Sequence, residues 1–297
     1  MDILSLILTL RPQAQLSPEK PFIHWWGKAA HALLMNVVSQ ADPTLANSLH
    51  TGTGPRPFTV STLHGHFPNK SLNLEGDYTL RLTALNAEVA TILHNAATSG
   101  VLAPGMSVEL DYIPFKVERC ATQTADHPLA DQANYQDMAG QAFFNPILPP
   151  HELTFEFASP VFFSTPNRSG AKNSEARSSE LPYPAAEYVI GSLLERWNAF
   201  APMAFPVDVR RYAAESLVVR RFSLRSRTIS VAGGVHTGAM GHITFKSLHY
   251  DRYWMSILHV LARYAFYAGV GAKTTMGLGQ CRRLALANTK ADAPLLV

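Results

Sequence analysis

Cysteine is scarce in this sequence. Among 297 residues only Cys120 and Cys281 are cysteines, so at most one disulfide can form and the paired spacing of a cysteine-based metal site is missing. Two small core residues explain the pair more simply than a redox role does. So few cysteines suit a reducing compartment, and a cytoplasmic location is expected.

Long apolar runs are also missing. The first ten residues are apolar, but they include Asp2, lack a basic flank and are too short to cross a bilayer. They predict a buried strand, so neither a signal peptide nor a membrane partner is expected. With 47% hydrophobic residues the chain can still bury a sizeable core, and its length allows two domains.

Charge is modest overall but unevenly distributed. The net charge is +3. The segment from residue 206 to 233 contains six arginines and two acidic residues, so its net charge is +4 and that of the rest of the chain is −1. The two-residue period of a strand places Arg221, Arg225 and Arg227 on one face and Phe222 on the other. Such a row is either a solvated sheet face or a contact surface for RNA phosphates.

The most informative motif is the glycine-rich loop, residues 269–280. Its four glycines allow positive φ and let another backbone approach closely. Main-chain amides could then face phosphate oxygens, while a lysine and two threonines add charge and hydroxyl donors. The candidate RNA-binding residues of this loop are Gly269, Gly271, Lys273, Thr274, Thr275, Gly277 and Gly279.

Two nucleotide-binding motifs do not fit this loop. A dinucleotide fingerprint follows a strand and opens a helix, with its third glycine three residues after the second. Here the next glycine comes six residues later, and the expected order is helix, loop, strand. The Gly-Lys-Ser/Thr of a phosphate-binding P-loop is missing at the required offset. A nucleotide cofactor is therefore not expected, and no other cofactor or metal is either.

Hydrophobic periodicity predicts the same order of elements in both halves of the chain. The first half shows strands at 3–10, 58–63, 77–85 and 107–119, and helices at 23–38, 43–50 and 86–97. The second half shows strands at 152–157, 216–231, 241–246 and 279–286, and helices at 184–200 and 251–268. A connection at 121–150 and a loop at 166–181 show no clear period.

This order is close to β-α-β-β-α-β, the ferredoxin-like unit, repeated once. The pattern predicts an α+β protein of two tandem ferredoxin-like domains. We place the N-terminal domain at residues 1–145 and the C-terminal domain at residues 146–297.

Three motifs resemble one known family. They are the run DPTLANSLH at 42–50 followed by GPRPFTVS at 54–61, the segment Ser159-Pro160-Val161, and the glycine-rich loop. In this order they are similar to the second helix with its catalytic histidine and next strand, the opening of the second domain, and the glycine-rich loop of the Cas6 family. These are CRISPR-associated endoribonucleases of the repeat-associated mysterious protein superfamily. The resemblance covers nearly the whole chain and also implies tandem ferredoxin-like domains.

The resemblance implies a metal-independent endoribonuclease that cuts precursor CRISPR RNA within its repeats and leaves a 2′,3′-cyclic phosphate and a 5′-OH. Precursor CRISPR RNA is then the expected partner. Subunits of a CRISPR effector complex and a second copy of the chain are further candidates. The contrasting hypothesis is a non-cleaving RNA-binding subunit of the same superfamily, which would use the loop and the arginines without an acid–base pair.

His50 aligns with the catalytic histidine of this family, and histidine suits either proton-transfer role because its pKa lies near 6.5. Arg56 falls where the family often has a lysine that stabilises transition-state charge, although a surface cation is an equal alternative. Met35 stands where several relatives carry a tyrosine. His31 lies four residues earlier on the same helix face and could replace that tyrosine, or could simply pack there.

The other ring side chains have weaker claims. His64 and His66 could share one strand face, but a zinc site would need further ligands. Trp25, Trp26 and Trp254 could stack on bases, yet at helical spacing core packing explains them better.

Overall fold

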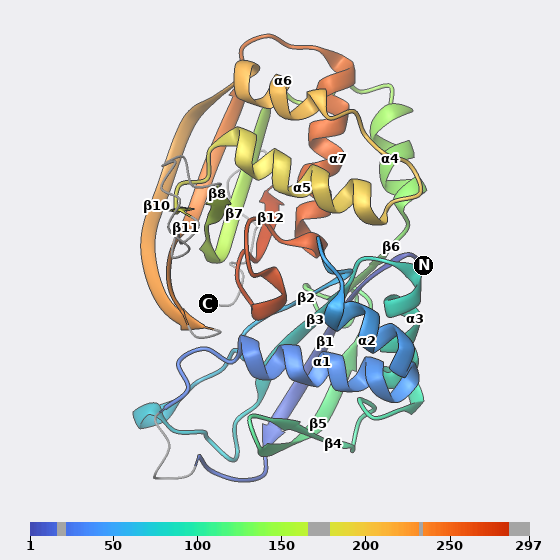
Figure 1. The fold of residues 1–297 in the computed structure, drawn as a ribbon, viewed down its shortest axis with the longest axis vertical. Coiled ribbons are helices and arrows are strands. Elements are labelled where there is room, and N and C mark those ends of the chain that lie inside the picture. Colours follow the sequence, from blue (N-terminus) through green and yellow to red (C-terminus); the bar gives the residue numbers. More distant parts are fainter. Residues whose placement is uncertain (17–21, 166–178, 232–233, 285–297) are drawn as a thin grey trace. The chain divides into compact units, whose positions relative to one another are not determined.

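The computed structural model describes residues 1–16, 22–165, 179–231 and 234–284 (Figure 1). The chain divides into two compact units. The first comprises Met1–Met138, Ala199–Pro202 and Thr275–Gly277, and the second comprises Ala139–Asn198, Met203–Thr274 and the chain from Leu278 onward. Among the described residues, no helix is both long and apolar enough to cross a membrane.

The first unit is an antiparallel sheet with helices packed on it. Its strands lie in the order β2-β3-β1-β5-β4, and β6 pairs with β1 beside this path. The elements are β1 (Ile3–Pro12), α1 (Gly27–Ala41), α2 (Pro43–Thr51), β2 (Phe58–Val60), a short 3₁₀ turn (Pro68–Lys70), β3 (Tyr78–Ala84), α3 (Ala87–Ser99), β4 (Ser107–Leu110), β5 (Ile113–Ala121) and β6 (Asp131–Ala133).

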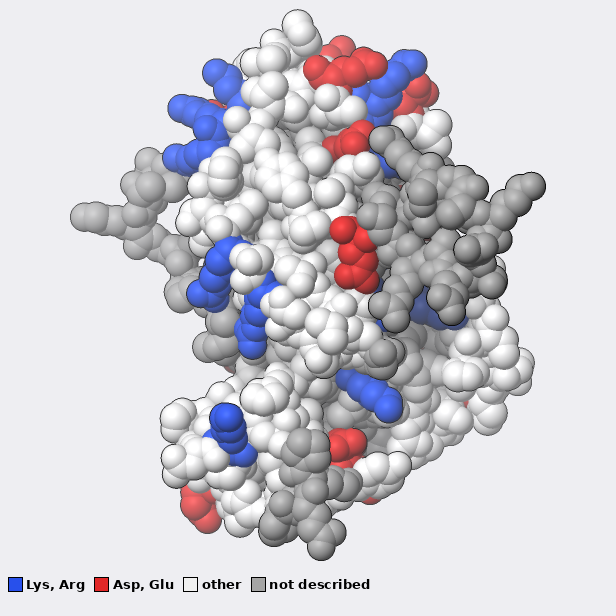
Figure 2. Space-filling view, turned by 60° about the vertical axis from the view of Figure 1, so that its left-hand side comes forward, with Lys and Arg blue, Asp and Glu red and all other residues white. Residues whose placement is uncertain are grey.

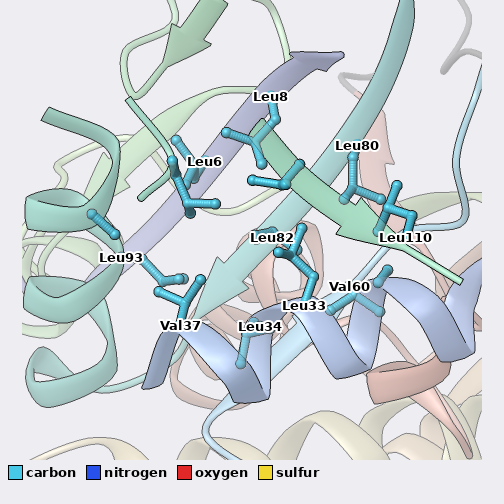
Figure 3. Close-up of a cluster of buried hydrophobic side chains, with 14 of the residues drawn as sticks. Leu6, Leu8, Leu33, Leu34, Val37, Val60, Leu80, Leu82, Leu93 and Leu110 are labelled. Carbon is cyan, nitrogen blue, oxygen red and sulfur yellow. The ribbon is translucent and has the colours of Figure 1, made fainter. Parts of the chain in front are cut away.

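The core of this unit lies between the sheet and helices α1 and α3 (Figure 3). In α1 the buried apolar residues recur at helical spacing, whereas in β1 every second residue is a leucine that turns into this core. The labelled side chains from these elements and from β3 converge in Figure 3: Leu33, Leu34, Val37, Leu6, Leu8, Leu80, Leu82 and Leu93. Their burial fixes α1 on the sheet and leaves His31 partly exposed at the margin of the apolar stripe.

The second unit repeats the plan, with the strand order β10-β11-β7-β12. Figure 1 shows α5 and α7 beside this sheet. From α4 onward the elements are α4 (Tyr135–Phe143), β7 (Glu152–Val161), β8 (Phe163–Thr165), β9 (Ser179–Leu181), α5 (Ala186–Phe200), α6 (Asp208–Ser216), β10 (Leu217–Val231), β11 (Gly234–Ser247), α7 (Arg252–Ala268), a 3₁₀ turn (Thr274–Met276) and β12 (Cys281–Leu284). Parts of α4, α5 and this 3₁₀ turn belong to the first unit. Both sheets have the ferredoxin-like order, so the predicted α+β class with tandem ferredoxin-like units is confirmed.

Several local predictions differ from the structure. The single strand predicted at 107–119 is a hairpin, β4 and β5, whose turn places Asp111 at φ 50° and Tyr112 at φ 66°. Non-glycine residues rarely adopt such angles, so no turn is predicted from these residue types. Helices α4 and α6 were not expected, and α1 begins four residues after the predicted start. Residues 166–178 of the predicted loop and 285–286 of the last predicted strand lie outside the described residues.

The hairpin of β10 and β11 is longer than predicted. β11 begins at Gly234 instead of 241 and pairs with β10 out to Val231. β10 is an edge strand of its sheet, and the side chains on both of its faces are exposed along most of its length. Phe222, expected on the apolar face, is 63% exposed.

His259 on α7 connects this helix to β12. The backbone carbonyl of Pro150 accepts from Nε2 at 2.9 Å, and Nδ1 accepts from Nη1 of Arg283 at 3.0 Å. A carbonyl can only accept and a guanidinium can only donate, so the neutral Nε2–H tautomer is required. Burial, assisted by the charge of Arg283, lowers the pKa of His259 to about 4.

This pKa makes folding stability depend on pH. The unfolded chain takes up the proton near pH 6.5 and the folded chain only near pH 4, so the stabilisation is complete above pH 6.5 and is lost on acidification. We expect His259 to lower the free energy of unfolding by about 2 kcal/mol between about pH 6.5 and about pH 5. Urea denaturation should show a shallower pH dependence for His259→Gln and an unchanged one for the exposed control His249→Gln. Equal slopes for wild type and His259→Gln would contradict the assignment.

Candidate active site and RNA-binding loop

Helix α2 carries the first candidate, His50, in its last turn. Asp42 caps its start, because Oδ1 accepts from the backbone N–H groups of Thr44 and Leu45, both at 2.9 Å. Pro43 occupies the first helical position, which needs no N–H. The cap fixes where the helix begins, and His50 therefore lies in its last turn with an exposed side chain.

Arg56 braces the turn that follows His50. Its Nη2 donates to the carbonyl oxygen of Gly52 at 2.6 Å, and Nη1 donates to that of Gly54 at 3.5 Å. A guanidinium has five N–H donors, so further donors are left for an acceptor outside the chain. Arg56 thus combines a fixed position with positive charge.

His31 has a defined tautomer. The carbonyl oxygen of Thr275 lies 3.0 Å from Nδ1, and a carbonyl can only accept, so Nδ1 carries the proton and Nε2 carries the lone pair. Burial lowers the pKa of His31, and the charges of Arg56 and His50 lower it further against the opposing effect of the Thr275 carbonyl. The three predicted catalytic residues therefore lie close enough together to influence one another.

Position 35, where several relatives carry a tyrosine, holds a side chain that packs against the core. Met35 is partly buried and packs against the core of the first unit. Trp25 and Trp26 are also buried, and Nε1 of Trp25 donates to the carbonyl oxygen of Met276 at 2.7 Å, so core packing accounts for both. No group of three metal-type ligands occurs among the described residues, and His66 is exposed.

The glycine-rich loop is folded on its own backbone. All four of its glycines have positive φ, between 62° and 87°, and so does Lys273 at 57°. Several loop amides are already used within the chain: Val270 donates to Gly279, Ala272 to Phe162, Leu278 to Lys273 and Gly279 to Pro160. Amides that could face a ligand are thus confined to the stretch from Lys273 to Gly277.

The space left by the missing Cβ atoms is filled by the protein itself. A Cβ on Gly271 would overlap the carbonyl oxygen of Phe162, and one on Gly279 would overlap that of Val270. A Cβ on Gly277 would lie 2.9 Å from the backbone nitrogen of Thr62. The glycines therefore serve internal packing first. Lys273 and Thr275 are partly exposed, whereas Thr274 is buried.

The predicted row of arginines is present on β10. The pairing with β11 is regular from Arg221 to the end of the strand, so Arg221, Arg225 and Arg227 share one face and all three are exposed. Nε of Arg221 donates to Oγ1 of Thr244 at 3.3 Å. Figure 2, which brings the side of β10 and β11 forward, shows Lys and Arg in separate groups with uncharged surface between them. The three arginines thus form a row on the β10–β11 hairpin.

Arg196 on α5 also contacts the glycine-rich loop and was not among the predicted residues. Its Nη2 donates to the carbonyl oxygen of Gly271 at 2.6 Å and contacts Oγ1 of Thr274 at 3.4 Å, while Nη1 donates to Oγ of Ser192 at 2.5 Å. It therefore supports the glycine-rich loop directly. A charged residue seven positions after Val189 falls on the apolar face of the helix, and that misplacement was the available signal.

Comparison with known families gives two matches on this chain. The model of the CRISPR Cas6 N-terminal domain matches residues 3–98. The model of the CRISPR-associated endoribonuclease Cas6 matches residues 155–281. Comparison with curated proteins gives no sequence match.

Solved structures of Cas6 proteins match nearly the whole chain. The product complex of Cas6 TTHB231 from Thermus thermophilus is 25% identical, with a TM-score of 0.74 over 95% of this chain and 100% of that one. The product complex of Cas6 TTHA0078 is 25% identical, with a TM-score of 0.72 over 96% and 100%. A substrate mimic complex of TTHA0078 is 26% identical, with a TM-score of 0.67 over the same shares. Because family models match both halves and these structures match along the whole length, the chain belongs to the Cas6 family of CRISPR-associated endoribonucleases.

Proposed function

We propose that this protein cuts precursor CRISPR RNA within its repeats by attack of the RNA's own 2′-OH, without a catalytic metal ion. The observation that carries the proposal is His31, which is held in one tautomer beside His50 and Arg56. Product and substrate-mimic complexes of the similar Cas6 proteins support RNA as the ligand.

His31 is proposed as the general base. The Thr275 carbonyl holds the proton on Nδ1, so Nε2 can accept the proton of the 2′-OH. The lowered pKa of His31 favours the neutral ring that a base requires at neutral pH. The 2′ oxygen then forms a bond to the scissile phosphorus.

His50 is proposed as the general acid. As the bond from phosphorus to the 5′ oxygen breaks, protonated His50 gives its proton to that oxygen, which leaves a 2′,3′-cyclic phosphate and a 5′-OH. Arg56, whose position is set by the Gly52 and Gly54 carbonyls, stabilises the negative charge that builds on the phosphate oxygens. Proton exchange with water restores both histidines.

RNA binding is proposed for two surfaces. The glycine-rich loop offers Lys273 and Thr275 together with the amides around them. The exposed face of β10 offers Arg221, Arg225 and Arg227 to phosphates. Subunits of a CRISPR effector complex and a second copy of the chain stay predicted partners.

The nucleophile can be tested on the RNA. We expect a 2′-deoxy sugar on the nucleotide 5′ of the cut to abolish cleavage, because the attacking oxygen is removed, while binding persists. Cleavage of the all-ribose repeat should continue in EDTA. Gel analysis of both substrates under single-turnover conditions gives the answer, and a 2′-deoxy sugar one nucleotide away serves as the control. Cutting of the first deoxy substrate, or loss of activity in EDTA, would refute the mechanism.

The two histidines can be separated by substitution. His50→Ala should slow single-turnover cleavage by roughly 10²-fold or more, the scale of one proton-transfer group, and leave RNA affinity nearly unchanged. His31→Asn is the sharper variant, because its amide N–H can replace Nδ1–H toward Thr275 while Nε2 is lost. It should fold normally and also lose roughly 10²-fold in rate.

The exposed histidine His66 supplies the matched control, and His66→Ala should cut at the wild-type rate. A small loss for His31→Asn would mean that His50 acts with Arg56 or with substrate positioning alone. If His50→Ala cleaves the RNA at the wild-type rate, the catalytic assignment of His50 is wrong. If the wild-type protein binds repeat RNA but leaves it intact, the non-cleaving RNA-binding hypothesis is the correct one.

A further inference from the structure

The second unit contains a cavity beside the glycine-rich loop that the proposed catalytic groups do not use. Its volume is about 250 Å³, against about 30 Å³ for one water molecule in the liquid, so it has room for a hydrated ionic group. Helices α5 and α6, strand β8 and the loop all contribute to its wall. The residues that matter for the argument are Tyr188, Ser192, Glu195, Arg196, Arg210 and Gly271.

Arg196 brings a partly buried positive charge to this cavity. The hydrogen-bond partners of its guanidinium are neutral: a serine hydroxyl, a threonine hydroxyl and backbone carbonyls. Burial lowers the pKa of Arg196, which reflects the cost of holding this charge away from water. A partly buried cation with neutral partners favours an anion nearby, because pairing offsets that cost.

Arg210 adds a second cation from α6. Its guanidinium lies over the ring of Tyr188, 5.8 Å from the ring centre. Gly191 leaves room for the arginine stem, since a Cβ there would lie 3.1 Å from Cδ and Nε of Arg210. Among the described residues neither Arg196 nor Arg210 forms an ion pair, although the exposed carboxylate of Glu195 also lines the cavity.

Ser192 supplies a neutral donor. Its Oγ accepts from Nη1 of Arg196 at 2.5 Å and from the backbone N–H of Gly271 at 2.9 Å. A hydroxyl that accepts two hydrogen bonds is left with its own proton to donate. Two guanidinium groups and a hydroxyl around one space match the oxygens of a phosphate group.

We propose that this cavity binds one phosphate of the RNA strand that contacts the glycine-rich loop, with Arg196 and Arg210 as its cationic ligands. The proposal rests on the proposed function, because it takes RNA as the source of the phosphate. Gly271 joins the two sites physically: its carbonyl holds Arg196, and the loop continues from it to Lys273 and Thr275.

The test uses Arg210, because this exposed side chain does not hold the loop. Arg210→Gln should weaken repeat RNA binding about tenfold, the scale of a hydrogen bond between charged groups. It should also reduce the slope of log affinity against log salt by about 0.7, the share of one single-strand phosphate. The matched control is Arg211→Gln on the same helix, whose guanidinium pairs with Asp208 at 3.1 Å instead of lining the cavity.

A scan of single methylphosphonate linkages then identifies the phosphate. We expect one neutral linkage that weakens binding to the wild-type protein but has little further effect on Arg210→Gln. Equal salt slopes for Arg210→Gln and Arg211→Gln, with no linkage whose effect depends on Arg210, would overturn the proposal. Saturable binding of inorganic phosphate that Arg210→Gln abolishes, without any such linkage, would assign the cavity to a small anion and overturn the RNA source.

Failure of the phosphate-site inference can be distinguished from failure of the proposed cleavage function. If the wild-type protein cuts repeat RNA while Arg210→Gln binds it normally, this inference fails and the proposed function stands. If the wild-type protein neither binds nor cuts repeat RNA, the proposed function fails, and with it the RNA source of the phosphate.

Discussion

The closure of the glycine-rich loop on its own backbone is the constraint from which the rest of the candidate site follows. Val270 and Gly279 are joined by an amide-to-carbonyl bond of 2.8 Å, and Ala272 is tied to Phe162 at the same distance. These bonds require backbone angles and clearances that only glycine supplies cheaply. The carbonyl of Thr275, within the same loop, accepts from Nδ1 of His31. A sequence feature that suggested ligand binding therefore acts first as a structural element.

In the proposed mechanism, one hydrogen bond links the candidate RNA-binding loop to the proposed general base. The carbonyl of Thr275 selects which nitrogen of His31 carries a proton, and burial lowers the pKa of the ring. The turn around Arg56 fixes a positive charge by two backbone carbonyls of the same short segment. Neither device needs a long-range network. The candidate site depends instead on the positions of two loops, which is compatible with the proposed reaction, in which the RNA supplies its own nucleophile.

Periodicity predicted most of the helices and strands because each buries one clear apolar face. The predictions were wrong where tertiary context overrides local pattern. The β4–β5 turn uses Asp111 and Tyr112 at positive φ, and Phe222 is exposed on a strand whose two faces are both largely uncovered. Resemblance to the Cas6 family supplied the candidate catalytic residues, but no pattern indicated the tautomer of His31. Arg196 escaped notice because its role depends on a loop 75 residues away in the chain.

The contact between α1 and the tip of the loop has a consequence for the exchange of parts between related proteins. Gly27 opens α1, and any side chain there would overlap the carbonyl oxygen of Met276. On the opposite side of this contact, Gly277 lies against the backbone of Thr62. The two glycines are 250 residues apart in the chain, and each leaves room for a backbone that a side chain would overlap or crowd: Met276 against Gly27, and Thr62 against Gly277. In a chimera that combines the loop of one relative with the α1 of another, the residue at position 27 and the loop backbone come from different proteins and are not matched. Position 27 and the loop must therefore be transferred together.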